Sequence, residues 1–335
     1  MLSRGQDEKS LTRFVNKASA LRAEEEGHTA WEFDRRLIAA MVSQPNRFYS
    51  SFTIPKKSGG ERRIDAPHKP LKMVQRALSF VFDSMFSPAE SAYGFIHGRG
   101  IVQNAQVHLG QDYVLNVDLK GFFPSISTGR LIALFRSNPA TDMSVYMATS
   151  IARLCSFRGA LPQGSPASPV LTNMVSVRLD ARLAGLSQRY GCTYSRYVDD
   201  LTFSAERRRP LDKMMPRLEQ ILVTEGFELN PDKTRMQFRS MRQEVTGLVI
   251  SHSDSGVEPM VNAPRKFRRD VRAALHVWRR DGLQLAAERN VATGDPDVFI
   301  HQIRGKVAHM CHVNRTPEAN RIHTEFNTLL KRDRP

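Results

Sequence analysis

Cysteine is scarce in this sequence, and the residues that occur lie far apart. Cys155, Cys192 and Cys311 are the only cysteines among 335 residues, and they form no CxxC pair. A disulfide framework and a zinc ribbon both need paired cysteines, so neither is indicated. His309 and His312 stand close to Cys311, but no second pair of ligands accompanies them. We therefore expect no structural metal centre at the cysteines.

Long apolar runs are also missing. No stretch reaches the roughly 18 consecutive apolar residues that a membrane-spanning helix requires. The first ten residues are polar and lack the apolar core of a signal peptide. With 41% hydrophobic and 25% charged residues, the composition is ordinary for a globular protein. We expect a cytoplasmic protein with no membrane partner.

Negative charge falls well short of positive charge. There are 49 Lys and Arg against 34 Asp and Glu, which gives a formal net charge of +15 at pH 7. The excess is concentrated toward the C-terminus, where residues 261–335 hold 15 basic and 8 acidic side chains. A globular protein this basic usually faces a polyanion, and nucleic acid is the first candidate. The alternative is a basic surface that faces only solvent.

The hydrophobic pattern predicts a chain that mixes helices with strands. Helices are expected over 1–50, 71–85 and 171–186, and in the segment that follows Pro264. Strands are expected over 52–65 and 194–204, each as a hairpin, and over 113–119. We find no internal repeat and no low-complexity linker. The pattern therefore indicates an α+β protein.

Three aspartates are expected to meet at one edge of the predicted sheet. Asp118 closes one strand, and Asp199 and Asp200 occupy the turn of the second hairpin. If these strands are neighbours, the carboxylates converge, and a cation would relieve their mutual repulsion. Mg²⁺ prefers such oxygen ligands, and two ions about 3.5–4 Å apart can stabilise both oxygens of a nucleotidyl transfer. The alternative is that Asp199-Asp200 is an ordinary turn.

Several motifs follow one another around these aspartates. They are NVDLKGFFP at 116–124, LPQGSPASP at 161–169, YVDD at 197–200 and NPDKT at 230–234. In this order they resemble the first catalytic-acid motif, the LPQG…SP motif, the YxDD box and the motif that follows it in reverse transcriptases. NAQVH at 104–108 and VTG at 245–247 resemble two signatures of bacterial retron reverse transcriptases. The alternatives are a helix cap at Asn104 and a plain turn at Thr246-Gly247.

The resemblance implies a right-hand polymerase with fingers, a ferredoxin-like palm and a helical thumb. An N-terminal helical extension is expected over 1–50, and fingers with the NAxxH region over 51–110. The palm is expected over 111–255, with a fingers segment interleaved near 128–170. The basic helical thumb is expected over 256–335.

The resemblance also implies roles at the catalytic centre. It implies that Asp118, Asp199 and Asp200 bind two Mg²⁺ ions, and that Lys233 donates a proton to the departing pyrophosphate. A surface position is the alternative for Lys233. The residues expected to contact the incoming dNTP or its surroundings are Lys56, Arg62, Arg63, Phe123 and Gln163.

The nucleotide-binding residues differ in what they are expected to do. Phe123 stands where the family has its steric gate against a ribose 2′-OH, and core packing of Phe122 and Phe123 is the alternative. Arginine suits phosphate oxygens, but the sequence does not distinguish Arg62 from Arg63 in this role, and solvated charges are the alternative for both. Gly164 is expected to permit a close backbone approach beside Gln163.

RNA contacts are expected at the two retron signatures and on the basic C-terminal helix. The candidates are Asn104, His108, Val245, Thr246, Gly247, Arg265, Lys266, Arg268, Arg269 and Arg272. Seven basic residues lie from Arg265 to Arg280, where phosphate contacts would give affinity without reading sequence. An amphipathic helix with a solvated basic face is the alternative.

A retron enzyme is expected to copy its cognate non-coding RNA (msr-msd) into msDNA, starting from a guanosine 2′-OH and using dNTPs. The resemblance further implies a role in antiphage defence beside an effector protein. One alternative is a scaffold that binds RNA and msDNA and holds a toxin effector inactive. Another is a bacterial reverse transcriptase outside the retrons.

Overall fold

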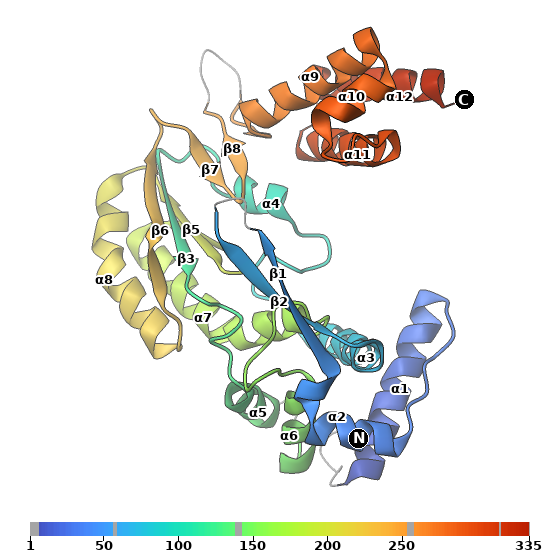
Figure 1. The fold of residues 1–335 in the computed structure, drawn as a ribbon. Helices are drawn as coiled ribbons and strands as arrows, with labels where there is room; N and C mark the ends of the chain where they lie inside the picture. The colour runs from blue at the N-terminus through green and yellow to red at the C-terminus, as the bar shows by residue number, and fades with distance from the viewer. Residues whose placement is uncertain (1–6, 56–58, 138–142, 253–257, 315, 335) are drawn as a thin grey trace.

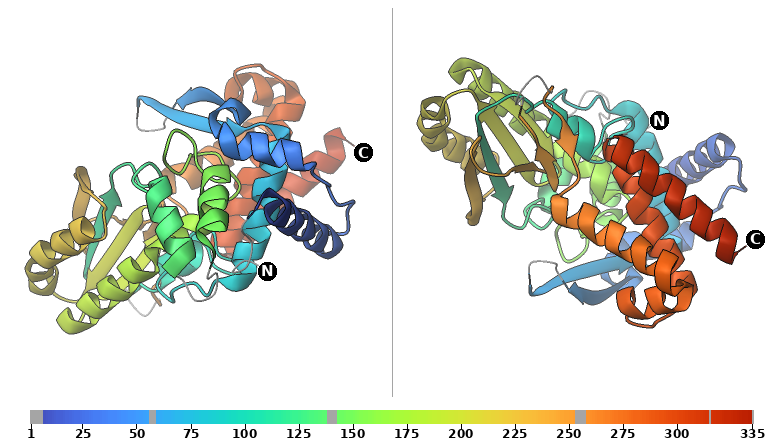
Figure 2. Two further views of the ribbon diagram at one scale, coloured as in Figure 1. Left: turned by 90° about the horizontal axis from the view of Figure 1, so that it is seen from below. Right: turned by 90° about the horizontal axis from the view of Figure 1, so that it is seen from above.

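The computed structural model describes residues 7–55, 59–137, 143–252, 258–314 and 316–334. The N-terminal part begins with α1 (Glu8–Glu26), α2 (Arg35–Ser43) and a short 3₁₀ helix, η1 (Pro45–Phe48). The side chain of Asp7 caps α1, because its Oδ1 accepts from the backbone N–H of Ser10 at 2.8 Å. Helix α1 packs against α3 (Lys69–Met85), and Figure 2 shows the two side by side.

Along the sequence, a long β-hairpin lies between η1 and α3. Strands β1 (Tyr49–Pro55) and β2 (Glu61–Pro67) pair antiparallel, from Tyr49 opposite Pro67 to Pro55 opposite Glu61. Most side chains of β1 are exposed. In Figure 1 the hairpin crosses the centre of the view. The hairpin expected over 52–65 is therefore present and slightly longer.

The central sheet carries the catalytic motifs. It contains β3 (Tyr113–Leu119), β4 (Thr193–Tyr197), β5 (Asp200–Ala205) and β6 (Leu229–Phe238), in the antiparallel order β4-β5-β3-β6. Helices α7 (Ser168–Tyr190) and α8 (Arg208–Thr224) pack on it and on each other (Figure 1). A βαββαβ chain order with this strand order is the ferredoxin-like arrangement, which confirms the expected palm. Helices α5 (Thr128–Ser137) and α6 (Val145–Leu154) are inserted between β3 and α7, where the sequence predicts interleaved fingers.

A small second sheet connects the palm to the C-terminal helices. It consists of β7 (Gln243–Val245), β8 (Leu248–Ile250) and β9 (Val261–Asn262), and α4 (Ile101–Gln106) packs on it. The C-terminal helices are α9 (Arg265–Asp281), α10 (Leu283–Asn290), α11 (Pro296–Val313) and α12 (Pro317–Asp333). They surround their own core, in which the buried Trp278 ring contacts Phe299 and Phe326. They lie at the opposite end of the molecule from α1 and α2 (Figure 1). Within the described ranges, no helix is both long enough and apolar enough to cross a membrane.

Candidate active site

The sheet brings the three aspartates to one place, as the sequence predicts. Asp118 and Asp200 are directly opposite each other in the β3–β5 pair. The backbone N–H of Leu119 donates to the carbonyl of Asp199 at 3.1 Å, which ties the β4–β5 turn to the end of β3. Cross-strand neighbours on one face have Cβ atoms only about 5 Å apart. The antiparallel register therefore sets Asp118 beside the Asp199-Asp200 turn.

Burial and mutual repulsion make this cluster unfavourable for negative charge. Burial raises the pKa of Asp200 to about 6, and the charges of Asp199 and Asp118 add to the rise. Burial likewise raises the pKa of Asp199, with a further contribution from Asp118. Lys233 compensates in part, because its Nζ lies 2.8 Å from Oδ1 of Asp118. This hydrogen bond is also the main reason why the pKa of Lys233 is raised.

The carboxylates fit a divalent cation that is held partly by the protein and partly by substrate phosphates. Asp118 is already engaged at both oxygens, because Asn230 Nδ2 donates to its Oδ2 at 3.0 Å and Lys233 binds its Oδ1. Among the described residues, no three acidic, histidine or cysteine side chains form a complete metal-binding group. Mg²⁺ is commonly held by one or two carboxylates together with substrate phosphates and water. The aspartates are therefore suitable partial ligands for a catalytic divalent ion.

A cavity of about 620 Å³ opens beside the aspartates and brings the predicted nucleotide-binding residues together. Asp118, Asp199 and Lys233 line it on the palm side. The lining residues from the hairpin and the neighbouring loops include Arg62, Arg63, Phe123 and Gln163. Lys56, also predicted to bind nucleotide, lies outside the described residues. The remaining predicted residues thus share one cavity with the acids.

The two phenylalanines of the NVDLKGFFP motif have different surroundings. Phe122 is buried, and its ring stacks on Phe227 with centroids 5.4 Å apart. Phe123 is only partly buried and faces the cavity. Core packing therefore accounts for Phe122, and Phe123 remains the candidate for the steric gate.

The structure distinguishes the two hairpin arginines. Arg63 braces the hairpin, because its Nε donates to Asp65 Oδ1 at 2.8 Å and its Nη2 donates to Ser51 Oγ at 3.0 Å. The side chain of Arg62 forms no hydrogen bond or ion pair with the side chain of another described residue, and its charge lowers the pKa of Asp199. Arg62 is therefore the arginine that remains available to a ligand in the cavity.

The LPQG loop is joined to the base of the hairpin. The backbone N–H of Asp65 donates to the carbonyl of Gln163 at 2.9 Å. Gly164 has φ of +133°, and a Cβ atom there would lie 2.8 Å from the carbonyl oxygen of Asp65. Only glycine fits this backbone conformation and this contact without strain. The close approach predicted at Gly164 is confirmed.

Sequence reasoning missed Arg158, which lines the same cavity. Its backbone is left-handed, with φ of +52°, and its N–H donates to Asn46 Oδ1 at 2.9 Å. Its guanidinium carbon lies 5.1 Å from the centre of the Phe157 ring, within the range of a cation–π contact. No sequence motif indicated this residue. Asn230, the Asp118 partner, was also missed, although the NPDKT motif contains it.

The NAxxH side chains do not reach a surface where RNA could contact them. His108 is fully buried, and its ring nitrogens lie 2.7 Å from the hydroxyls of Ser204 and Ser195 on the central sheet. Burial lowers the pKa of His108 to about 3, so the ring is neutral. Asn104 is also fully buried within α4, so it does not cap that helix. The prediction of direct RNA contact is wrong for both side chains, which instead belong to the interior between α4 and the sheet.

The VTG signature forms the turn between β7 and β8. Val245 is buried, so it too is excluded from direct RNA contact. Thr246 and Gly247 have φ of +48° and +79°, which is the backbone of a tight hairpin turn. Both line a second cavity, of about 380 Å³, together with Asp118 and Asp200. The turn and two of the aspartates therefore share this second cavity.

The predicted RNA-binding residues of α9 divide into two groups. Arg268 and Arg272 form ion pairs with Glu318 of α12, at 2.6 and 3.4 Å. Lys266, Arg265 and Arg269 are exposed, and Lys266 approaches Asp270 at 3.6 Å. The first group holds α9 to α12, while the second faces solvent and is available to a polyanion.

Comparisons with known proteins agree with this geometry. Residues 54–255 match the family model described as reverse transcriptase (RNA-dependent DNA polymerase). The chain is 39% identical to the retron Mx162 reverse transcriptase of Myxococcus xanthus, over 68% of this chain and 52% of that protein. It is 31% identical to the retron Ec86 reverse transcriptase of Escherichia coli, over 68% of this chain and 69% of that protein.

Alignments with solved structures are more distant. A telomerase from Candida albicans aligns with 11% identity and a TM-score of 0.45, over 88% of this chain and 67% of that chain. A foamy viral protease-reverse transcriptase aligns with 16% identity and a TM-score of 0.45, over 89% and 43%. The chain spans about half the length of the first curated relatives, 52% and 56%. The chain belongs to the reverse transcriptase family, among the retron reverse transcriptases.

Proposed function

We propose that this chain is an RNA-directed DNA polymerase whose chemistry takes place at Asp118, Asp199 and Asp200. The observation that carries the proposal is the shared cavity, which Asp118 and Asp199 line together with Arg62 and Phe123. Such a cavity suits a deoxynucleoside triphosphate, which presents both a phosphate chain and a sugar. Two Mg²⁺ ions bound by the aspartates would stabilise the attacking and the leaving oxygen.

The remaining residues position the substrate. Arg62 binds phosphate oxygens through its planar guanidinium, and Arg63 keeps the hairpin in place. Lys56 is a further proposed contact of the triphosphate. Phe123 excludes a ribose 2′-OH, and Gln163 contacts the incoming nucleotide or the template beside it. Lys233 is protonated and half exposed, so its Nζ can donate a proton to the departing pyrophosphate.

The template that we propose is a structured non-coding RNA (msr-msd), copied into msDNA. The support is the likeness to retron reverse transcriptases together with the net charge of +15. Priming from a guanosine 2′-OH would place that nucleotide in the second cavity, where Thr246 and Gly247 lie beside Asp118 and Asp200. Exposed residues of α9, including Arg265, Lys266 and Arg269, would bind RNA phosphates. We further propose action in antiphage defence beside an effector protein.

The division of the chain follows from this role. We propose an N-terminal extension over 1–50, fingers over 51–110 with an interleaved segment near 128–170, a palm over 111–255 and a thumb over 256–335. The separate core of α9 to α12 supports treating the C-terminal helices as one unit.

The test is to express the chain with the non-coding RNA next to its gene, isolate the DNA and treat it with a debranching enzyme. A change in mobility that releases linear DNA supports 2′-primed synthesis. DNA joined to RNA through an ordinary 3′ junction would favour a reverse transcriptase outside the retrons. The absence of DNA, with the RNA intact and bound, would favour a binding role.

A further inference from the structure

The turn that carries Asp199 has a strained backbone. Val198 has φ of +61°, a left-handed conformation that β-branched residues rarely adopt. Such strain persists only where the surrounding structure holds the residue in place. The contacts around Val198 therefore identify what fixes the position of Asp199 and Asp200.

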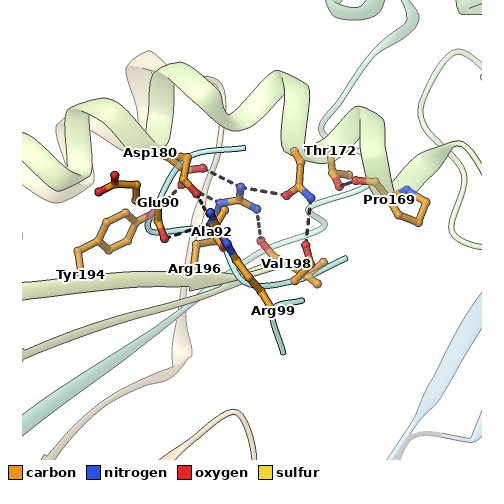
Figure 3. Close-up of polar contacts among 12 residues, drawn as sticks. Glu90, Ala92, Arg99, Pro169, Thr172, Asp180, Tyr194, Arg196 and Val198 are labelled. Carbon is orange, nitrogen blue, oxygen red and sulfur yellow. Dashed lines mark hydrogen bonds and ion pairs between the residues drawn. The ribbon is translucent and has the colours of Figure 1, made fainter. Parts of the chain in front are cut away.

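Arg196 supplies one of these contacts, with its guanidinium between α7 and the turn (Figure 3). Its side chain is buried, and its Nε and Nη2 bind the two carboxylate oxygens of Asp180 on α7, each at 2.7 Å. Its Nη1 donates to the carbonyl of Val198 at 3.2 Å, and its Nη2 also donates to Asn173 Oδ1 at 3.1 Å. The guanidinium thus joins α7 to the turn itself.

A second contact comes from the segment that precedes α4. Asn173 Nδ2 donates to the carbonyl of Gly94 at 3.0 Å. A Cβ atom at Gly94 would lie 2.7 Å from both the backbone nitrogen and the Cγ2 of Val198. The backbone N–H of Arg196 donates to Ser91 at 2.7 Å, which fixes this segment against β4. The turn therefore rests on a glycine that is itself held by Asn173.

Stability alone does not explain a charged pair at this position. A buried ion pair often contributes no more than well-packed apolar side chains of similar size, because desolvation opposes the attraction. An apolar pair could fill the space of Arg196 and Asp180, but it could not donate to the carbonyl of Val198. The feature specific to arginine is that its remaining donors reach the turn and Asn173.

We infer that Arg196, held by Asp180, is a positioning residue that fixes the left-handed Val198 turn and so places Asp199 and Asp200 against Asp118. The inference rests on the proposed polymerase function. It assigns Arg196 no contact with substrate. Its effect passes through the backbone of the turn to the metal-binding carboxylates.

The first test replaces the pair by apolar residues, as Arg196→Met with Asp180→Leu. We expect a folded protein that binds RNA normally, with kcat reduced by about tenfold to a hundredfold, because small misplacements of reacting groups have effects of this size. The Mg²⁺ concentration for half-maximal rate should rise, and KM for dNTP should change little. A folded double variant with wild-type kcat and wild-type Mg²⁺ dependence would overturn the inference.

A second variant tests the positioning of the Val198 turn if the double variant does not fold. Gly94→Ala should lower kcat and raise the Mg²⁺ requirement, because the added methyl group pushes on Val198. Gly185→Ala is the matched control, since a Cβ there on α7 meets nothing within 4 Å. Equal activity of the two alanine variants would contradict the inference.

Binding of Mn²⁺, followed by electron paramagnetic resonance, separates this inference from the proposed function. It reports the placement of the carboxylates without requiring synthesis. Weaker Mn²⁺ binding by the variants supports the positioning role even if the wild-type protein makes no DNA, a result that would defeat only the proposed function. Unchanged Mn²⁺ binding in folded variants would count against the positioning role.

Discussion

The buried His108 should make the protein sensitive to mild acid. The pKa of His108 is about 3 in the folded chain and 6.5 as an ordinary histidine. Between these values the unfolded chain binds a proton that the folded chain does not, so stability is full above about pH 6.5 and falls as the pH drops. At 1.36 kcal/mol for each pKa unit, this one group accounts for a loss of about 2 kcal/mol between pH 7 and pH 5.

The assay is urea unfolding at pH 7 and pH 5, without metal, for the wild type and for His108→Gln. The variant lacks the titrating group, so its loss of stability over this interval should be smaller by about 2 kcal/mol. Asp200 acts in the opposite direction, because its raised pKa makes the folded state gain stability as the pH falls, but this contribution is common to both proteins. His301→Gln, an exposed substitution, is the control and should match the wild type. An equal pH dependence for His108→Gln and wild type would refute the buried, neutral state of His108.

Further predictions concern the cavity. Arg62→Ala should raise KM for dNTP by about tenfold to a hundredfold, the range expected for a lost hydrogen bond to a charged group. Steady-state kinetics should show a smaller rise in KM for Arg63→Ala. A larger rise for Arg63→Ala than for Arg62→Ala would reject the assignment of Arg62. Phe123→Ala should raise ribonucleotide incorporation by about tenfold or more, and a soluble, active variant with unchanged sugar selectivity would reject the gate. Gly164→Ala should lower the free energy of unfolding by about 1–3 kcal/mol through backbone strain, which thermal unfolding can measure. It should also weaken dNTP binding, which kinetics can measure. Unchanged stability and unchanged dNTP binding would show that the contact with Asp65 is unimportant.

The sequence predicted the parts of the site that depend on order along the chain. The strand that ends in Asp118 and the turn at Asp199-Asp200 were predicted from local pattern, and an antiparallel register was enough to bring them together. The close backbone approach at Gly164 is predicted because glycine has no side chain, whereas its positive φ is seen only in the structure.

Features that depend on which side chains meet across the fold could not be predicted. The NAxxH signature predicts RNA contact for Asn104 and His108, but the packing of α4 on the sheet buries them, and burial is not visible in a motif of five residues. Arg196 and Asp180 form their ion pair across 16 residues of sequence, and no local pattern indicates that they meet. Arg158 owes its place in the cavity to the turn that follows α6, which carries no family signature.

The polymerase assignment is tested most directly by DNA synthesis with purified Asp199→Asn protein in Mg²⁺, measured beside RNA binding. Asparagine is similar in size but lacks the negative charge that a metal ligand supplies here. Asp212→Asn, on the exposed side of α8, is the matched control and should behave as wild type. We predict that Asp199→Asn abolishes DNA synthesis while RNA binding remains nearly unchanged. Near-normal synthesis by this variant would contradict the placement of the active site.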